Sequence, residues 1–211
     1  MGTLFSTAYF PSVLYMAEII QTDEIIIEAF ESYPKRTSRN HCAIYGPNGL
    51  QKLTVPVIRV DGNHTFTKNI RISNHNPWQT VHLRSIETAY HNSPFFLFYM
   101  DYLFPFFEKK FSFLIDLNLE LLQVLLTFLK TEKQVRFSTS FEKVPVGLRD
   151  LRNEKGLVKI ENQALYPSYT QVFEPRHGFF PGLSILDLIL NLGPEAPGYL
   201  KILNENIRSI D

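Results

Sequence analysis

The sequence predicts an α/β fold with a mixed sheet. We expect an N-terminal β-α-β unit and a β-hairpin, followed by a mostly helical middle and C-terminal part. Three observations predict this class. Two apolar runs, 4–10 and 25–30, flank an amphipathic stretch that Pro11 opens. A Gly-Pro-Asn-Gly turn at 46–49 separates two strand-like segments, and a long stretch with helical periodicity occupies 111–129.

The N-terminal segments are expected to form a right-handed β-α-β unit. A buried strand over 4–10 precedes a helix that runs from Pro11 to about Gln21, and a second strand follows over 25–30. Two strands joined by so short a helical crossover pair in parallel. The turn after the first strand and the segment after the second then leave the same edge of the sheet, where α/β proteins bind ligands.

The middle of the chain predicts a hairpin, a strand and two helices. The hairpin covers 43–57, and the alternation of apolar residues in 66–72 predicts another strand. Asn76-Pro77 predicts a helix start, with the asparagine as N-cap, and this helix runs to about Tyr90. The Ser-Pro pair at 93–94 repeats the signal and starts a further helical stretch.

The remaining segments predict helices and short strands. The stretch 111–129 carries polar residues within its apolar pattern, so it is expected to be an amphipathic core helix rather than a membrane span. A strand is expected over 135–139 and an edge strand over 170–173, with a polar, irregular and exposed segment over 145–166 between them. The stretch 184–192 predicts a helix that ends at the following Gly-Pro pair.

Composition indicates one folded domain, and we expect it to cover 1–211. The chain is 45% hydrophobic and 14% aromatic, which is enough to fill a core. Lys and Arg number 21 against 21 Asp and Glu, so the overall charge argues against a dedicated nucleic-acid or membrane-surface binder. The single cysteine, Cys42, excludes an internal disulfide and fits a reducing compartment. We expect a cytoplasmic protein with no membrane insertion.

A basic block follows the second expected strand. From Tyr33 to His41 it contains three fixed cations and no acid: Lys35, Arg36 and Arg39. The wider window 32–86 holds eight Lys or Arg and one acid. Arginine suits bidentate contact with phosphate or carboxylate, so an anionic ligand is one explanation of the block. A solvated charged loop is the other, and the position after a strand favours the ligand.

His82 is the candidate general base. It lies about one turn into the helix after Pro77, near Trp78. A histidine beside an aromatic ring and a cationic loop can have a lowered pKa and accept a proton. The residues alone favour the simpler reading, a half-buried histidine with satisfied hydrogen bonds.

Three further residues have a structural and a functional reading. Asp187 lies three residues after Ser184 in a pattern typical of a capping box, which we prefer over a catalytic carboxylate. Tyr9 and Tyr15 flank the start of the first helix, where their rings could stack on a sugar or base. Tyrosines in such places are more often part of the core or its rim.

The generic catalytic and cofactor motifs are absent. The sequence contains no phosphate-binding loop, dinucleotide fingerprint, nucleophile elbow or zinc-protease motif. One cysteine also excludes a cysteine-rich zinc site. We therefore expect no cofactor and no metal.

Several segments, in order, resemble those of one family. Tyr9-Phe10-Pro11 followed by Tyr15 resembles its opening pattern, although Ser6-Thr7-Ala8 stands where many members carry Gln-Pro. Lys35-Arg36 and Arg39-Asn40 resemble its Lys-Arg and Arg-Asn pairs. Further matching segments are Leu53–Val57, Trp78, His82, Tyr90–Phe96, Asp150–Arg152, Tyr169–Phe173, Phe179–Leu188 and Gly193–Glu195. By their order and spacing, the chain resembles the WbqC-like protein family from about Ser6 to Leu200.

The resemblance implies a bacterial cytoplasmic protein linked to surface-polysaccharide (O-antigen) biosynthesis. Transfer of glycine or another acyl group to an amino sugar has been suggested for the family. We therefore expect an acyl or aminoacyl transferase whose partner is an anionic small molecule, such as a nucleotide-linked sugar or an acyl donor. The alternative is a non-catalytic ligand-binding or scaffold protein of the same pathway.

The expected roles follow from that chemistry. His82 would be the base, and Lys35 or a backbone N–H would stabilise the oxyanion. The expected substrate-binding residues are Arg36, Arg39, Asn40, Tyr9, Tyr15, Trp78 and Asp187. The sugar, the donor and the oligomeric state are left open by the residues.

Overall fold

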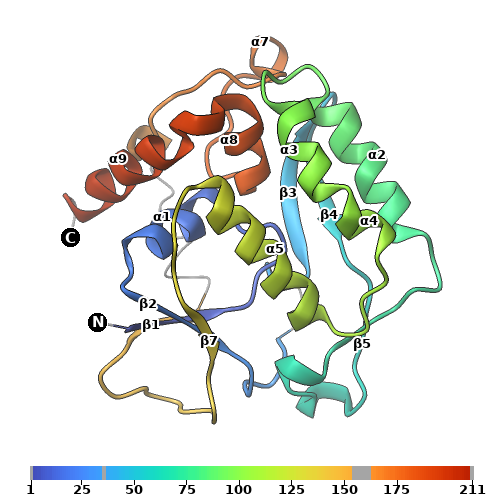
Figure 1. Ribbon diagram of the computed structural model, residues 1–211, viewed down its shortest axis with the longest axis vertical. Coiled ribbons are helices and arrows are strands. Elements are labelled where there is room, and N and C mark those ends of the chain that lie inside the picture. The colour runs from blue at the N-terminus through green and yellow to red at the C-terminus, as the bar shows by residue number, and fades with distance from the viewer. Residues whose placement is uncertain (1, 35–36, 154–162, 210–211) are drawn as a thin grey trace.

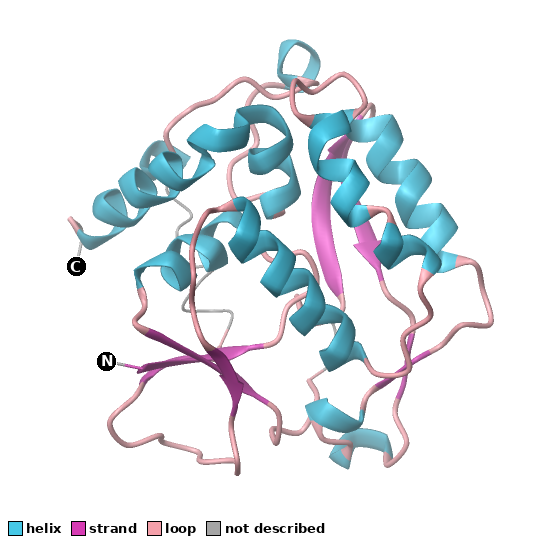
Figure 2. Ribbon diagram, viewed as in Figure 1, coloured by secondary structure: helices cyan, strands magenta, loops and turns pink. Residues whose placement is uncertain are grey.

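The computed structural model describes residues 2–34, 37–153 and 163–209. Its centre is a parallel sheet with strand order β7-β2-β1-β8 (Figure 1). The strands are β1 (Gly2–Ser6), β2 (Glu24–Glu28), β7 (Val135–Phe137) and β8 (Arg149–Leu151). Figure 2 shows the long helices above this sheet and two short helical turns at the lower right. A mixed α/β fold with a hairpin and a helical C-terminal part is confirmed.

The N-terminal β-α-β unit is also confirmed. Strands β1 and β2 pair in parallel, with Leu4 opposite Ile26, and α1 (Val13–Gln21) connects them. The Ser12 hydroxyl caps α1 by accepting the backbone N–H of Tyr15 at 3.2 Å. The first strand ends at Ser6, earlier than expected, because residues 7–10 form a turn instead.

The hairpin consists of β3 (His41–Gly46) and β4 (Gly49–Thr54), paired antiparallel around the expected turn. Beyond it, β5 (Val57–Ile58) pairs with β6 (Arg71–Ile72), and the 3₁₀ turns η1 (Gly62–His64) and η2 (Thr67–Asn69) lie between them. The predicted strand over 66–72 is therefore wrong for most of its length. Backbone N–H groups of Thr67 and Lys68 donate instead to the carbonyls of Glu31 and Ala29, which folds this segment against the chain after β2.

Four helices make up the middle of the chain: α2 (Trp78–Tyr90), α3 (Phe96–Leu103), α4 (Pro105–Glu108) and α5 (Leu114–Phe128). The N-cap position of α2 is Pro77 rather than Asn76, and no side chain caps it. Helix α5 is amphipathic as expected, with Leu117, Leu121 and Leu125 fully buried. Within the described residues, none of the helices has the length and apolar character to cross a membrane.

Two predictions for the C-terminal part are wrong. The segment predicted to be irregular, 145–166, contributes β8, which pairs in parallel with β1 at the edge of the sheet. Residues 154–162 of that segment lie outside the described residues. The stretch 170–173 is no strand but leads into α7 (Glu174–His177), because the backbone N–H and carbonyl of Gln171 both bond Glu174.

The predicted helix at 184–192 is confirmed as α8 (Ile185–Leu192). Gly193 ends it with a positive φ of 54°, which only glycine adopts easily. The short turns η3 (Gln163–Leu165) and η4 (Gly193–Glu195) precede α9 (Ala196–Arg208), a helix that the sequence had not indicated. Helix α9 packs on α1, and the core continues from the sheet to Leu203.

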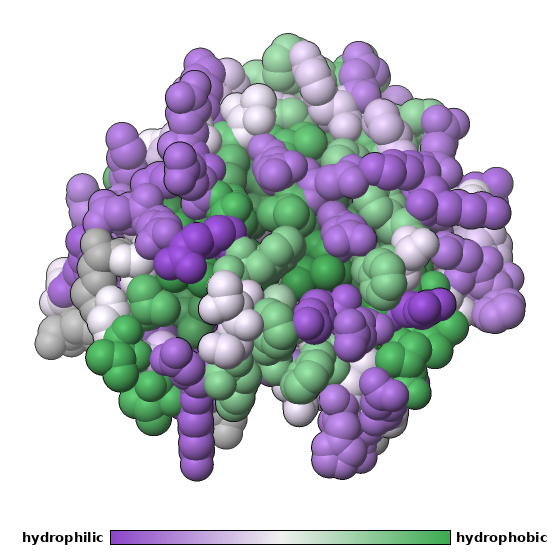
Figure 3. Space-filling view, turned by 60° about the horizontal axis from the view of Figure 1, so that its bottom comes forward, coloured by the Kyte–Doolittle hydropathy of each residue, from purple (hydrophilic) through white to green (hydrophobic). Residues whose placement is uncertain are grey.

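Figure 3 shows the face that lies at the bottom of Figure 1, where hydrophilic side chains predominate and hydrophobic groups reach the surface between them. The loop between β7 and β8 lies on this side, and its Val144 and Val146 are exposed.

Candidate functional site

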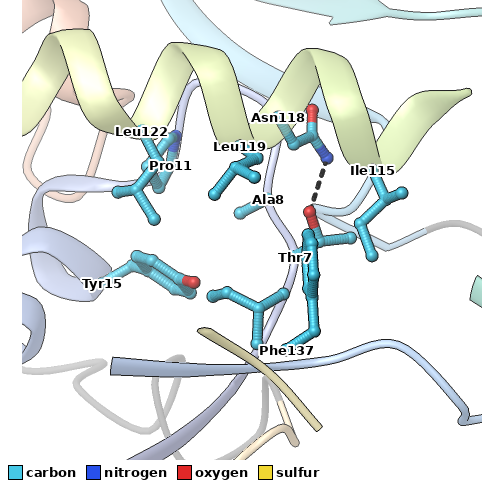
Figure 4. Close-up of a pocket in the computed structure, with 10 residues that line it drawn as sticks. Thr7, Ala8, Pro11, Tyr15, Ile115, Asn118, Leu119, Leu122 and Phe137 are labelled. Atoms are coloured by element: carbon cyan, nitrogen blue, oxygen red, sulfur yellow. Dashed lines mark hydrogen bonds between the residues drawn. The ribbon is translucent and has the colours of Figure 1, made fainter. Parts of the chain in front are cut away.

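The turn after β1 and the segment after β2 meet at the carboxyl edge of the sheet, as the sequence predicted. The backbone N–H of Tyr9 donates to the carbonyl of Ser38 at 3.0 Å. Asn118 of α5 joins both segments, since its amide group donates to the Thr7 hydroxyl at 3.0 Å and to the Arg39 carbonyl at 2.8 Å. Figure 4 shows Asn118 pointing from α5 towards Thr7, beside a small gap that Tyr15 also lines.

The first of two hollows at this edge, which we name the charged hollow, has a volume of about 430 Å³. Glu31 and Arg39 line it from the segment after β2, and Asp150 and Arg152 line it from β8. The buried Arg39 guanidinium is paired bidentately with Glu31, at 2.7 and 3.0 Å. Its charge is therefore already balanced within the protein.

Arg152 is balanced in the same way. It donates to Asp150 at 2.7 Å and to Glu28 at 2.9 Å, and Glu28 is completely buried at the end of β2. The remaining Glu28 oxygen accepts the Ser138 hydroxyl at 2.7 Å and the Phe30 N–H at 2.8 Å. Contact with Arg152 lowers the pKa of Asp150, whereas burial raises the pKa of Glu31 despite its pairing with Arg39.

The charged hollow can offer either sign of charge to a ligand. Its described surroundings hold three carboxylates, Glu28, Glu31 and Asp150, and two guanidinium groups. A bound anion would gain Arg39 or Arg152 only by sharing it with a carboxylate that already holds it. Lys35 and Arg36 lie outside the described residues, so their place at this hollow stays a prediction.

The second hollow, which we name the hydroxyl-lined cavity, has a volume of about 300 Å³. It lies on the other side of the segment 37–42, since Ser38 and His41 line it while Thr37 and Arg39 line the charged hollow. Tyr9, Tyr15, Ser12 and Ser184 complete much of its wall.

The wall of this cavity is held by internal hydrogen bonds and contains one strained residue. The Tyr15 hydroxyl donates to the Ser6 carbonyl at 2.8 Å. Phe10, in the turn after β1, has a φ of 39°, which is unfavourable for a bulky side chain. Such strain persists where surrounding contacts enforce it, and it is common at ligand sites. Cys42 also lines the cavity, and burial raises the pKa of its thiol, which keeps it protonated at neutral pH.

His82 lies behind the cavity rather than in its wall. It is 4% exposed, and its Nδ1 lies 2.9 Å from the Tyr9 hydroxyl. A hydrogen bond to the Thr54 backbone uses its other N–H, so Nδ1 accepts the Tyr9 proton. Burial lowers its pKa to about 4, which leaves the imidazole neutral at pH 7. The Trp78 ring packs against it at 5.1 Å between centroids.

Asp187 is buried away from both hollows. Its carboxylate accepts the Tyr169 hydroxyl at 2.5 Å and the Gln171 amide at 2.8 Å, and Tyr90 faces the same group. Burial raises the pKa of Asp187 to about 6. Only one half of the expected capping box forms. The Ser184 hydroxyl accepts the backbone N–H of Leu186, but the Asp187 carboxylate bonds the Tyr169 hydroxyl rather than the backbone of Ser184.

The remaining expected ligand residue has a structural contact. The Asn40 side chain donates to the Val55 carbonyl at 2.9 Å, which ties the basic segment to the chain after β4. Of the expected site residues, Tyr9, Tyr15 and Arg39 therefore line a hollow, while Asn40, Trp78, His82 and Asp187 support the surrounding structure.

The residues that surround the charged hollow were mostly not anticipated. Glu28 and Glu31 are ordinary acids in the sequence, and only the placement of Glu28 at the end of an apolar run signals its burial. Arg152 belongs to a segment that resembled the family but had received no role. In residues 2–34, 37–153 and 163–209, no group of three or more His, Cys, Asp or Glu side chains is placed to hold a metal ion.

A parallel sheet with polar hollows at its carboxyl edge is an arrangement typical of small α/β ligand-binding domains. The chain belongs to the WbqC-like protein family, whose model matches residues 7–152. That range covers the chain from the turn after β1 to the end of β8 and includes most of the lining of both hollows. An uncharacterized protein of Mycobacterium tuberculosis is 30% identical over an alignment of 226 residues, covering 92% of this chain and 94% of that protein. No solved structure matches the chain significantly.

Proposed function

We propose that this protein is an acyl or aminoacyl transferase, with glycine as one candidate donor group, that acts on an amino sugar in bacterial surface-polysaccharide (O-antigen) biosynthesis. One observation carries the proposal: two adjacent hollows, one charged and one neutral, lie at the carboxyl edge of the parallel sheet. Such a pair suits a ligand with an anionic part and a neutral ring, such as a nucleotide-linked sugar. Family membership supports the pathway.

The proposed reaction joins an amine to an activated acyl group. The amine nitrogen of the sugar attacks the carbonyl carbon of the donor and a C–N bond forms. The bond between that carbon and the leaving group breaks, and the leaving group departs with the bonding electrons. The nitrogen loses one proton to a base, and the developing oxyanion needs a hydrogen-bond donor or cation.

Specific residues are proposed for these tasks. His82 is the proposed base, and because it is buried, it would receive the proton through the Tyr9 hydroxyl that already bonds its Nδ1. Lys35 is proposed at the oxyanion, and Arg36 and Arg39 at the anionic part of the substrate. Asn40, Trp78 and Asp187 would contribute to binding by holding the wall segments in place.

The second candidate is a non-catalytic ligand-binding or scaffold protein of the same pathway. The environment of His82 favours it. Both ring nitrogens are engaged, and a pKa of about 4 makes the imidazole a weak proton acceptor at neutral pH. Both described arginines of the charged hollow are likewise paired, an arrangement that stabilises the structure without any reaction.

A direct assay separates the two candidates. Purified protein is incubated with nucleotide-linked amino sugars and activated acyl donors, and the products are weighed by mass spectrometry. A transferase yields the N-acylated sugar, and a His82→Gln variant that still folds loses about 10²–10⁴-fold in rate. Absence of product with every donor, combined with retained sugar binding, would favour the second candidate.

The role of Arg39 in ligand binding can be tested against a matched control variant. Arg39→Gln should weaken binding of the nucleotide-linked sugar, because it removes a guanidinium at the hollow. Arg84→Gln removes the same charge from an exposed position on α2 and should leave binding unchanged. Equal affinities for both variants and the unaltered protein, measured by calorimetry, would contradict a role of Arg39 in binding.

A further inference from the structure

The hydroxyl-lined cavity differs chemically from the charged hollow beside it. Among the described residues that line it there is no Lys, Arg, Asp or Glu. Its partly exposed polar residues are Ser12, Ser38 and His41. The rings of Tyr9 and Tyr15 are only 1% and 4% exposed and form the buried base of the wall. Sugar rings bind to such uncharged polar surfaces, because their hydroxyl groups exchange hydrogen bonds with side-chain oxygen and nitrogen atoms.

The wall of the cavity is rigid on one side. Two helix starts, at Ser12 and Ser184, are joined by backbone hydrogen bonds from Val13 to Leu183 at 2.9 Å and from Ile185 to Pro11 at 2.8 Å. Each serine hydroxyl caps its own helix. The Tyr15 hydroxyl donates to the Ser6 carbonyl, which fixes the ring behind this wall. The polar atoms are thus held in place before a ligand arrives.

The size of the cavity restricts what it can hold. Its volume of about 300 Å³ lies at the lower end of the range for small-molecule sites. One sugar ring with a small substituent suits this space, whereas a nucleotide with its sugar needs more. The segment 37–42 forms a common wall with the charged hollow, so the anionic remainder of a ligand could lie on that side.

We propose that the hydroxyl-lined cavity is the subsite for the pyranose ring of the amino sugar, hydrogen-bonded to Ser12, Ser38 and His41, with the linked anionic group outside it. This assignment rests on the proposed function for its ligand class. It adds which surface recognises the sugar, and it separates sugar recognition from the arginines of the charged hollow.

The single cysteine of the chain provides the first test, because Cys42 lines the cavity. Its buried, protonated thiol reacts slowly, so the labelling rate is first measured without ligand at alkaline pH. If the unliganded protein is not labelled, the cavity-filling variant described below decides. Labelling by a small thiol reagent is followed by mass spectrometry, with and without UDP-glucosamine, other nucleotide-linked amino sugars, free glucosamine and UDP alone. At a concentration about ten times Kd, a ligand in the cavity should slow labelling about tenfold, because the unliganded fraction falls by that factor. UDP alone should not protect Cys42.

Two results overturn the proposal: equal protection by UDP alone, or no protection by any amino sugar, free or nucleotide-linked. These results are independent of turnover. Product formation without Cys42 protection rejects the subsite but keeps the transferase, whereas protection without product keeps the subsite and rejects the transferase.

A cavity-filling variant checks the assignment without removing a polar group. Ala43→Leu places a larger side chain in the cavity and should weaken binding of the amino sugar more than tenfold while binding of UDP is retained. Lys52→Leu, on the strand position opposite Ala43 but outside the lining, is the control for folding and for the hairpin. Equal sugar affinity for both variants, with intact thermal unfolding, would also reject the subsite.

Discussion

At the scale of single residues, Arg152 shows how the carboxyl edge is held together. Its guanidinium joins the end of β2 through Glu28 to the end of β8 through Asp150. Glu28 has no exposed surface, so its charge is tolerated only because it is paired and hydrogen-bonded.

Removal of that partner should therefore destabilise the protein strongly. We expect Arg152→Ala to lower the free energy of unfolding by about 3–5 kcal/mol, because Glu28 is left as an uncompensated buried charge. Arg136→Ala breaks the exposed pair with Glu24 and should leave stability nearly unchanged, because solvent screens this pair. Urea unfolding measures both, and similar losses for the two variants would contradict this account.

Asp187 gives a pH-dependent prediction. Its folded pKa of about 6 lies above the ordinary value of 3.8, so between these values the folded protein binds more protons than the unfolded chain. The contribution of Asp187 to the free energy of unfolding should therefore be greatest below about pH 4. It should fall by up to about 3 kcal/mol as the pH rises through 6.

The Asp187→Asn variant isolates that contribution, because other groups that titrate in this range, such as Glu31, are common to both proteins. As the pH rises from 4 to 7, the Asp187→Asn variant should become more stable relative to the unaltered protein. A constant difference over this range would show that Asp187 does not titrate with a raised pKa.

The sequence shows the charge of Arg39 and Asp187 but not their partners. Arg39 is expected to hold an external anion, and the sequence did not show that it also pairs with Glu31, eight residues away along the chain. The acid nearest to a cation in space depends on the path of the chain after β2, which side-chain chemistry alone does not specify. For Asp187, the spacing from Ser184 predicted a capping role. Its actual partners, Tyr169 and Gln171, belong to a segment that folding brings close to α8.

At the scale of elements, the predictions succeeded where local pattern decides the structure. The β1-α1-β2 unit, the hairpin and helices α2, α5 and α8 each carry their own turn or periodicity signal. Strand β8 does not, because its sequence Arg-Asp-Leu becomes a strand only by pairing with the edge of β1. The alternation at 66–72 failed for the converse reason, since backbone bonds to Glu31 and Ala29 prevail over the local pattern.

The cap of α8 is an element whose contribution can be measured. The Ser184 hydroxyl accepts the Leu186 N–H and donates to the Phe10 carbonyl, so Ser184→Ala should cost about 1–2 kcal/mol of stability. Thr127→Ala removes an exposed hydroxyl within α5 that bonds only its own helix, and should change stability by less than about 0.5 kcal/mol. Thermal unfolding of both variants checks this, and an equal shift would show that the cap contributes little.

At the scale of the whole molecule, one hydrophobic core extends from β1 through α5 to α9. We expect this continuity to make the chain unfold as a single unit over 1–211. In calorimetry, one transition should appear, with equal calorimetric and van't Hoff enthalpies. Two resolved transitions would show that the helical C-terminal part forms a separate domain.

The central claim is that a nucleotide-linked amino sugar binds at the carboxyl edge of the parallel sheet. The most direct measurement is a crystal structure of the protein with UDP-glucosamine, whose amine is free. We predict the sugar ring in the cavity lined by Tyr9, Tyr15 and Ser184, with the phosphates towards Arg39 and the charged hollow. A ligand bound elsewhere, with both hollows unchanged, would contradict the account.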